Sequence, residues 1–250
     1  MMATDHILLL AGTREARLLA GDLAKSFPTA RITASYAGAV SDLSDPGVPV
    51  RVGGFGGAEG LAAYLAAETV SVMIDATHPF AAQISRNAVA AAASTGIPLF
   101  RLERQEWAPV DGDNWKTVAS LENAAAVLPS DARAFLAIGR KDIACFTQRT
   151  DLHAVARMIE PPEAKLPDHW ELILSRPPKT VDEEIALFRD RQITHVVTKN
   201  SGGKRSSAKI RAARHLGLPV VMVRRPDLPE AATFSAPPDL LLAVRRAMAF

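Results

Sequence analysis

Cysteine is nearly absent from this chain of 250 residues. The single cysteine, Cys145, excludes a disulfide within the chain and any cysteine-rich metal site, and it fits a reducing compartment such as the cytoplasm. No apolar run is long enough to cross a bilayer, and we expect no signal peptide. The six histidines show no ligand spacing. The sequence therefore predicts a cytoplasmic protein without a metal site.

Net charge and aromatic residues are also scarce. The formal net charge is +2, and aromatic side chains make up 6% of the chain. The charge is unevenly spread, because residues 1–125 are net acidic and the remainder is net basic. A basic half indicates that the protein binds a polyanionic ligand or nucleic acid, or that it only has a solvated basic surface. Since the basic residues lack aromatic partners and alternate with prolines, glycines and acids, nucleic acid is the weakest of these interpretations.

The most informative pattern lies near the start of the chain. Residues 7–10 form an unbroken apolar run, which predicts a strand buried on both faces. Gly12 ends the run, and helical spacing begins at Thr13, which can cap the helix, with Glu15 in its first turn. A helix N-terminus after a buried strand offers free N–H groups to a phosphate. Alone the pattern is weak, because further glycines of the dinucleotide fingerprint are missing and many non-binding α/β domains open similarly.

The next two strands add to this interpretation. Residues 31–35 predict a strand that ends at Ser35, where a dinucleotide fold meets the adenosine ribose. An acid there favours NAD, but the next acid is Asp42, so the sequence favours NADP. Residues 49–52 predict a third strand, and the run 53–57 that follows contains four glycines. These glycines allow close approach of the backbone to a ligand, although a flexible surface loop has the same composition.

A polar cluster follows the fourth predicted strand, residues 70–74. The cluster ends in Thr-His-Pro-Phe, with Pro79 suited to the first turn of a helix and Thr77 or His78 as its cap. His78 is an acid, a hydrogen-bond donor to a ligand, or only a capping residue. A fifth strand is expected at 97–102. Parallel strands with helical crossovers make residues 1–105 a Rossmann-like domain for the cofactor.

The pattern restarts after an expected linker at 101–115. Further strands are predicted at 134–138, 152–158, 171–174, 195–197 and 218–223, with a terminal helix at 240–248. Basic residues follow most of these strands, namely Arg140, Lys141, Arg176, Lys199 and Lys204. Scattered basic residues usually form a solvated face, but repeated placement at strand ends favours one positively lined cleft. The fold class is therefore α/β, with two Rossmann-like subdomains of mainly parallel sheets, an interdomain cleft, and a basic substrate domain at 115–250.

Four motifs together resemble the precorrin-6A reductase family of cobalamin biosynthesis. They are Gly-Thr-Arg-Glu-Ala-Arg from Gly12, Gly-Gly-Phe-Gly-Gly from Gly53, Asp-Ala-Thr-His-Pro-Phe-Ala from Asp75 and Lys-Asn-Ser-Gly-Gly from Lys199. The segment 212–220 and Arg225-Pro226 extend the likeness over nearly the whole chain. The resemblance implies two Rossmann-like subdomains, NADPH as reductant, and a macrocyclic tetrapyrrole with many carboxylates as substrate. It also implies reduction of one ring double bond of precorrin-6A to give precorrin-6B (dihydroprecorrin-6).

The expected site residues fall into two sets. We expect the dinucleotide at Gly12, Thr13, Arg14, Glu15, Ser35, Gly54, Phe55, Gly56, Thr77, His78, Pro79 and Phe80. We expect the substrate carboxylates at Arg140, Lys141, Arg176, Asn200, Ser201, Gly202 and Lys204, because guanidinium groups bind carboxylates with two hydrogen bonds.

The reduction also needs a proton, and two residues are candidates for the catalytic donor. The first is Asp142, which follows a strand end beside two basic residues, and the second is Lys199. Asp142 has an alternative, non-catalytic role, in which it only caps a helix. Two other function classes remain: a non-catalytic NADP-binding sensor and a reductase of another polyanionic substrate. We expect a monomer or weak dimer that contacts neither nucleic acid nor membrane.

Overall fold

The chain folds into two compact α/β units. The computed structural model describes residues 5–38, 45–163, 165–178, 180–203 and 205–248. The first unit comprises the chain up to Arg104 and from Pro226 onward, and the second comprises Gln105–Arg225. The chain therefore enters the second unit once and returns to the first. Within the described residues, no helix is long and apolar enough to span a membrane.

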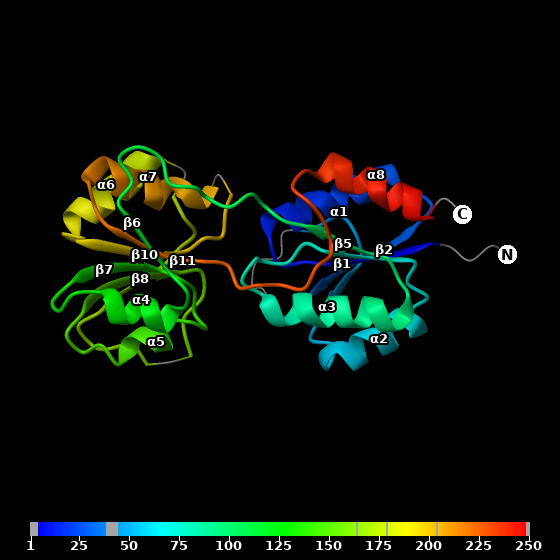
Figure 1. Cartoon of the computed structure of the whole chain (residues 1–250), viewed down its shortest axis with the longest axis horizontal. Helices are drawn as coiled ribbons and strands as arrows, with labels where there is room; N and C mark the ends of the chain where they lie inside the picture. The colour runs from blue at the N-terminus through cyan, green and yellow to red at the C-terminus, as the bar shows by residue number, and fades with distance from the viewer. Residues whose placement is uncertain (1–4, 39–44, 164, 179, 204, 249–250) are drawn as a thin grey trace. The chain divides into compact units, whose positions relative to one another are not determined.

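The first unit is a six-stranded parallel sheet in the order β12-β5-β4-β1-β2-β3. Its strands are β1 (His6–Leu10), β2 (Arg31–Tyr36), β3 (Val50–Val52), β4 (Val72–Asp75), β5 (Leu99–Leu102) and β12 (Ala232–Phe234). Its helices are α1 (Arg14–Ser26), α2 (Gly57–Ala67), α3 (Ala82–Thr95) and α8 (Pro237–Met248). Helices α1 and α8 cover one face of the sheet, and α2 and α3 cover the other (Figure 1).

The second unit repeats the architecture with the strand order β6-β11-β10-β7-β8-β9, again parallel. Its strands are β6 (Trp115–Val118), β7 (Arg133–Ala137), β8 (His153–Met158), β9 (Glu171–Leu174), β10 (His195–Lys199) and β11 (Val220–Val223). Its helices are α4 (Leu121–Val127), α5 (Ala144–Thr147), α6 (Val181–Asp190) and α7 (Ala208–Leu216), with a short 3-10 turn at Arg205–Ser207.

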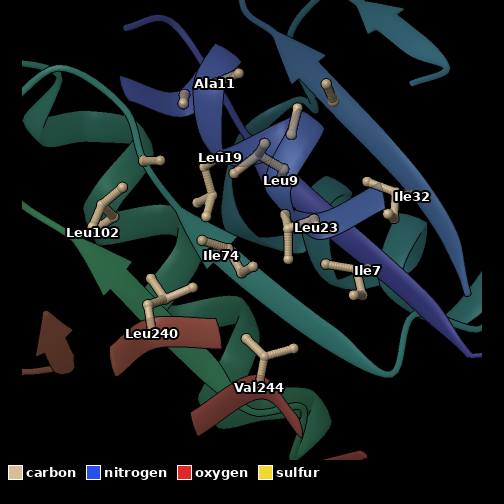
Figure 2. Packing of buried hydrophobic residues seen from close by; sticks show 14 of the residues in the cluster. Ile7, Leu9, Ala11, Leu19, Leu23, Ile32, Ile74, Leu102, Leu240 and Val244 are labelled. Atoms are coloured by element: carbon tan, nitrogen blue, oxygen red, sulfur yellow. The ribbon is translucent and has the colours of Figure 1, made fainter. Parts of the chain in front are cut away.

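The apolar run of β1 is buried on both faces, as the sequence predicts. Ile7 and Leu9 pack with Leu19 and Leu23 of α1 and with α8 on one side, as Figure 2 shows. Alternate side chains of β1, starting with Leu8, pack under α2 and α3 on the other side. This double burial is typical of a central parallel strand and fixes the position of the turn that follows it.

One domain boundary expected from the sequence is wrong. Residues 226–250 were expected in the second domain, but the described part of this segment belongs to the first unit. β12 pairs in parallel with β5, with Thr233 opposite Arg101, and Leu240 and Val244 of α8 join the first core. The expected linker, 101–115, overlaps the end of β5 and the first residue of β6, and β6, α4 and β12 are absent from the prediction. These elements are short or lie at sheet edges, where local pattern is weakest.

Two histidines, the buried His6 and the half-buried His195, make the stability of the fold depend on pH. His6 begins β1 and His195 begins β10; burial lowers the pKa of both below the ordinary value of 6.5. Because the unfolded chain then binds protons that the folded chain does not, the free energy of unfolding should decrease as the pH falls below about 6.5. Thermal unfolding between pH 5 and 8 measures this slope. The double variant H6N/H195N should reduce the slope of stability against pH. An unchanged slope would mean that other groups cause the pH dependence.

Candidate functional site

The first sheet reverses its winding between β1 and β4. These two strands are neighbours, with Leu10 in register with Asp75. From there the chain builds outward, to β2 and β3 on one side and to β5 on the other. In open parallel sheets the ligand binds beyond the C-terminal ends of the strands at such a switch point. The turns after β1 and β4 therefore form the candidate site of this unit.

Thr13 connects these two turns. Its Oγ1 accepts a hydrogen bond from the N–H of Ala16 at 3.0 Å, which confirms the expected cap of α1, and donates to the carbonyl of Ala76 at 2.9 Å. Gly12 before it has a φ of 146°, and a Cβ built there would meet nothing within 4 Å among the described residues. The backbone at the N-terminus of α1 therefore faces open space, which suits a phosphate group.

The charged residues in the first turn of α1 have different surroundings. Glu15 forms an ion pair with Arg104, with 3.3 Å between the carboxylate and Nη1. Arg14 is exposed and forms no ion pair within the described part of the chain. Of these two, Arg14 is the one whose charge is available to an anion at the turn.

The turn after β4 is held by a buried carboxylate. Oδ1 of Asp75 accepts from the backbone N–H of Thr77 at 3.2 Å and from its hydroxyl at 2.6 Å, and Oδ2 accepts from Nε of Arg101 at 3.3 Å. The side chains of Asp75 and Arg101 are only 2% and 7% exposed. Nη2 of Arg101 is buried without a hydrogen-bond partner among the described residues, and Arg101 lines a small cavity together with Thr77 and His78. The pair thus fixes this turn, and the Nη2 amino group of Arg101 keeps both of its hydrogens without a partner among the described residues.

The sequence predicts that a helix begins in this turn, but the structure does not have one there. α3 begins at Ala82, and its N-cap makes no side-chain hydrogen bond. Pro79 therefore lies before the helix, and neither Thr77 nor His78 caps it. The hydroxyl of Thr77 is bonded to the carboxylate before it, and Nδ1 of His78 accepts from the N–H of Phe80 at 3.2 Å. The cap prediction failed because local hydrogen bonds close this turn on itself.

Arg51 and Ser35 meet at the ends of β2 and β3. Ser35 is buried and in register with Arg51, whose Nη1 donates to its hydroxyl at 3.3 Å. Gly56 in the following turn has a φ of 81°, a left-handed conformation that glycine adopts without strain, and it precedes α2. The ring of Phe55 lies 3.9 Å from the Arg51 guanidinium, whose Nη2 also donates to the carbonyl of Gly54 at 2.7 Å. The glycine-rich turn is therefore anchored to β3.

In the second unit the switch point lies between β7 and β10. Lys199 ends β10, and its Nζ donates to Oδ2 of Asp142, which follows β7. The two candidate proton donors are thus in direct contact, with side chains 14% and 30% exposed. Asp142 does not cap α5, because the N-cap is Ile143 and it receives no side-chain hydrogen bond. The capping alternative for Asp142 is therefore wrong.

Asn200 fastens the loop that follows β10. Its Oδ1 accepts from the N–H of Trp107 at 2.9 Å, and its Nδ2 donates to the carbonyl of Trp107 at 3.0 Å and to Glu106 at 3.1 Å. The indole N–H of Trp107 donates to the carbonyl of Gly203 at 3.1 Å. Both hydrogens of the Asn200 amide are therefore used within the protein, and its contact with substrate stays a prediction. The same loop carries three further predicted residues, Ser201, Gly202 and Lys204, the last of which lies outside the described residues.

The other predicted substrate residues also follow strands of the second sheet. Arg140 lies after β7 and forms an ion pair with Glu160 at 3.1 Å while remaining 38% exposed. Lys141 and Arg176 are exposed, after β7 and β9 respectively. The positions agree with a basic rim along the C-terminal edge of this sheet, although substrate binding there stays a prediction. Within the described ranges, no group of three His, Cys, Asp or Glu residues is arranged to hold a metal ion.

Asp75, Arg101 and Arg51 were missed as site residues by sequence reasoning. Each of them had a local signal. Asp75 ends a buried apolar strand, and Arg101 and Arg51 are the charged residues of otherwise apolar strands. A charged residue in an apolar strand needs a partner, but the sequence does not say which residue that partner is. Only the order of the strands in the sheet identifies it.

Two doubly wound parallel sheets, with a capped helix and a glycine turn at the first switch point, define an α/β protein built from two Rossmann-like units. The comparisons with known proteins are more specific. Residues 6–245 match the family described as precorrin-6x reductase CbiJ/CobK, and the chain belongs to this family.

The relatives agree with this assignment. The chain is 49% identical over 227 residues to the precorrin-6A reductase of Rhodococcus erythropolis, covering 90% of this chain and 91% of that protein. It is 46% identical over 226 residues to the precorrin-6A reductase of Rhodobacter capsulatus, covering 90% and 89%. A solved structure described as CobK precorrin-6A reductase superposes with a TM-score of 0.90 at 42% identity, covering 98% of both chains. The family resemblance found in the motifs is confirmed.

Proposed function

We propose that this protein reduces one double bond of precorrin-6A to give precorrin-6B in cobalamin biosynthesis, with NADPH as the reductant. The observation that carries the proposal is the 49% identity to a precorrin-6A reductase over nearly its full length. Membership of a reductase family supports a nicotinamide cofactor, and the choice of NADPH over NADH is the finer part of the proposal.

The first unit offers a surface that fits the cofactor. The open backbone at Gly12 would receive the pyrophosphate, and Ser35 at the end of β2 would lie near the adenosine ribose. The turn from Thr77 to Phe80 would lie near the nicotinamide, where the buried Nη2 amino group of Arg101 has no partner among the described residues. When bound, NADPH supplies a hydride to the substrate. The chain itself contributes binding, orientation and the matching proton.

Lys199 is the proton donor in this proposal. Addition of a hydride to a double bond must be matched by a proton on the neighbouring carbon. In the ion pair with Lys199, the carboxylate of Asp142 accepts hydrogen bonds and has no proton to give. The ammonium of Lys199 has three N–H donors, of which Asp142 orients one. Lys199 therefore gives up the proton and regains it from solvent, and Asp142 acts as a positioning residue.

The basic strand ends of the second unit are proposed to hold the substrate carboxylates. Arg140 keeps more than a third of its side chain exposed despite its ion pair, and Arg176 and Lys141 are exposed. A guanidinium binds a carboxylate through two parallel hydrogen bonds, which orients the macrocycle as well as attracting it. The interdomain cleft, the cytoplasmic setting and the monomeric or weakly dimeric state stay predictions.

Incubation of the purified protein with precorrin-6A and NADPH, in the absence of oxygen, tests the function. We expect stoichiometric loss of the reduced-nicotinamide absorbance and a product heavier than precorrin-6A by two hydrogen atoms. Another polycarboxylated tetrapyrrole is the matched control and should leave NADPH unchanged. Binding of NADPH without turnover would instead support a sensor. Turnover only of the control compound would support a reductase of another polyanionic substrate.

A further inference from the structure

The chain connects its two units twice, at residues 104–105 and at residues 225–226. In the second unit these connections are flanked by residues 106–107 and residues 223–225, which we call the first and the second connecting segment. Asn200, the residue after β10, forms hydrogen bonds with both segments. A single residue therefore holds the two places where the second unit continues into the first.

The side chain of Asn200 holds the first connecting segment. Its amide pairs with both backbone groups of Trp107, accepting from the N–H at 2.9 Å and donating to the carbonyl at 3.0 Å. The amide also donates to Oε2 of Glu106 at 3.1 Å. Because Asn200 is only 6% exposed, water does not readily replace these hydrogen bonds.

The backbone of Asn200 holds the second connecting segment. Its N–H donates to the carbonyl of Val223 at 2.8 Å, and its carbonyl accepts from Nε of Arg225 at 2.9 Å. The guanidinium of Arg225 also forms an ion pair with Glu106 of the first segment, at 3.8 Å. The two connecting segments are thus joined to each other and to the same residue.

Asn200 is also the neighbour of the proposed proton donor in the sequence. Lys199 ends β10, and its ammonium is bonded to Asp142. The N–H of Ser201 donates back to the carbonyl of Lys199 at 2.7 Å, so the chain turns tightly around Asn200. A shift of Asn200 therefore shifts the backbone that carries the donor. Displacement of a reacting group by about 1 Å can lower a rate about 100-fold.

We propose that Asn200 is a positioning residue for the reduction, which fastens both connecting segments to the strand end that carries Lys199. In this role Asn200 acts through Lys199 and needs no contact with substrate. The oxygen and both hydrogens of its amide already have partners within the protein, which favours this role over direct binding of a substrate carboxylate. This inference rests on the proposed function, because it assumes that Lys199 delivers a proton during the reduction.

Replacement of Asn200 with alanine tests the positioning role. N200A should lower kcat about 10- to 100-fold and leave both KM for precorrin-6A and the affinity for NADPH within about twofold of the wild type. A residue that only binds substrate would raise KM instead. Hydrogen–deuterium exchange measures the fastening itself, because the N–H of Trp107 loses its acceptor and should exchange at least about 10-fold faster in N200A. A wild-type kcat in N200A, or a loss through KM alone, would overturn the proposal.

The contact between Asn200 and Glu106 offers a rescue that a substrate contact would not show. N200D places two carboxylates against each other and should be about as slow as N200A. In N200D/E106Q an amide at position 106 can donate to a carboxylate at position 200, which reverses the direction of the original hydrogen bond. We expect kcat to recover at least about 5-fold relative to N200D, since the two positions are coupled. A folded double variant without any recovery would count against the role.

Thr194 provides the matched control for a lost bond between a side chain and a distant backbone group. Its hydroxyl accepts from the backbone N–H of Arg133 at 3.0 Å, at the opposite, N-terminal edge of the same sheet. T194V should keep the wild-type kcat and the wild-type exchange at Trp107. If T194V is slowed as much as N200A, the effect is a general loss of stability and the positioning role is wrong. A wild-type protein that does not reduce precorrin-6A overturns the proposed function and this role together.

Discussion

Replacement of Lys199 with methionine is expected to lower kcat by about 10²- to 10⁴-fold, the usual contribution of a positioned proton donor. Methionine preserves most of the length of the side chain but carries no proton. The affinity for NADPH should stay close to that of the wild type, because Lys199 belongs to the second unit and the expected cofactor residues belong to the first. Pre-steady-state turnover of precorrin-6A, with a separate NADPH titration, distinguishes the two effects.

The Asp142→Asn variant separates the two candidate donors. If Asp142 only orients Lys199, its loss should cost less than the loss of Lys199, because the ammonium remains. The double variant D142N/K199M should then be about as slow as K199M alone, since residues that act as one unit show strongly non-additive effects. A D142N variant as slow as K199M, with normal fold and NADPH binding, would return the donor role to Asp142.

Lys116 serves as the control for a lost lysine in the same unit. It is exposed on the edge strand β6 and forms no ion pair within the described part of the chain. K116M should therefore turn over at the wild-type rate. Near-wild-type turnover by K199M as well would exclude Lys199 as the donor and leave Asp142 or water, which the D142N variant distinguishes.

The features of the fold that local sequence dictates were predictable. Four consecutive apolar residues predicted the central strand β1, and Thr13 predicted the start of α1. These features depend on burial and capping within a few residues. β12 could not be predicted in this way. It has three residues, and its position depends on pairing with β5, which lies about 130 residues earlier in the chain.

The same distinction applies to the site. The glycine turn and the basic strand ends were visible as motifs, because each lies within one stretch of sequence. The contact between Asp142 and Lys199 was not visible, since it requires β7 and β10 to be neighbours. The two residues were therefore treated as rivals, although the structure pairs them. The buried pair of Asp75 and Arg101 was missed for the same reason, because β4 and β5 bring its members together.

Replacement of Gly12 with valine should weaken NADPH binding by about 100-fold or more, the equivalent of two charge-assisted hydrogen bonds of about 1.5 kcal/mol each. A Cβ at this position meets no described atom within 4 Å apart from its chain neighbours, so the new side chain starts in the space expected for the pyrophosphate. Because the φ of 146° is unfavourable for valine, we also expect a stability loss of about 1–3 kcal/mol without unfolding.

Gly96 separates the loss of binding from the backbone strain. It has a φ of 72° at the C-terminus of α3, and a Cβ there also meets no described atom within 4 Å. G96V should therefore show a comparable fall in the unfolding midpoint but bind NADPH with wild-type affinity. Titration of the intrinsic NADPH fluorescence, together with thermal unfolding, measures both quantities for each variant. An unchanged affinity in folded G12V would place the pyrophosphate away from this turn, because no phosphate could approach the N-terminus of α1 past an isopropyl group.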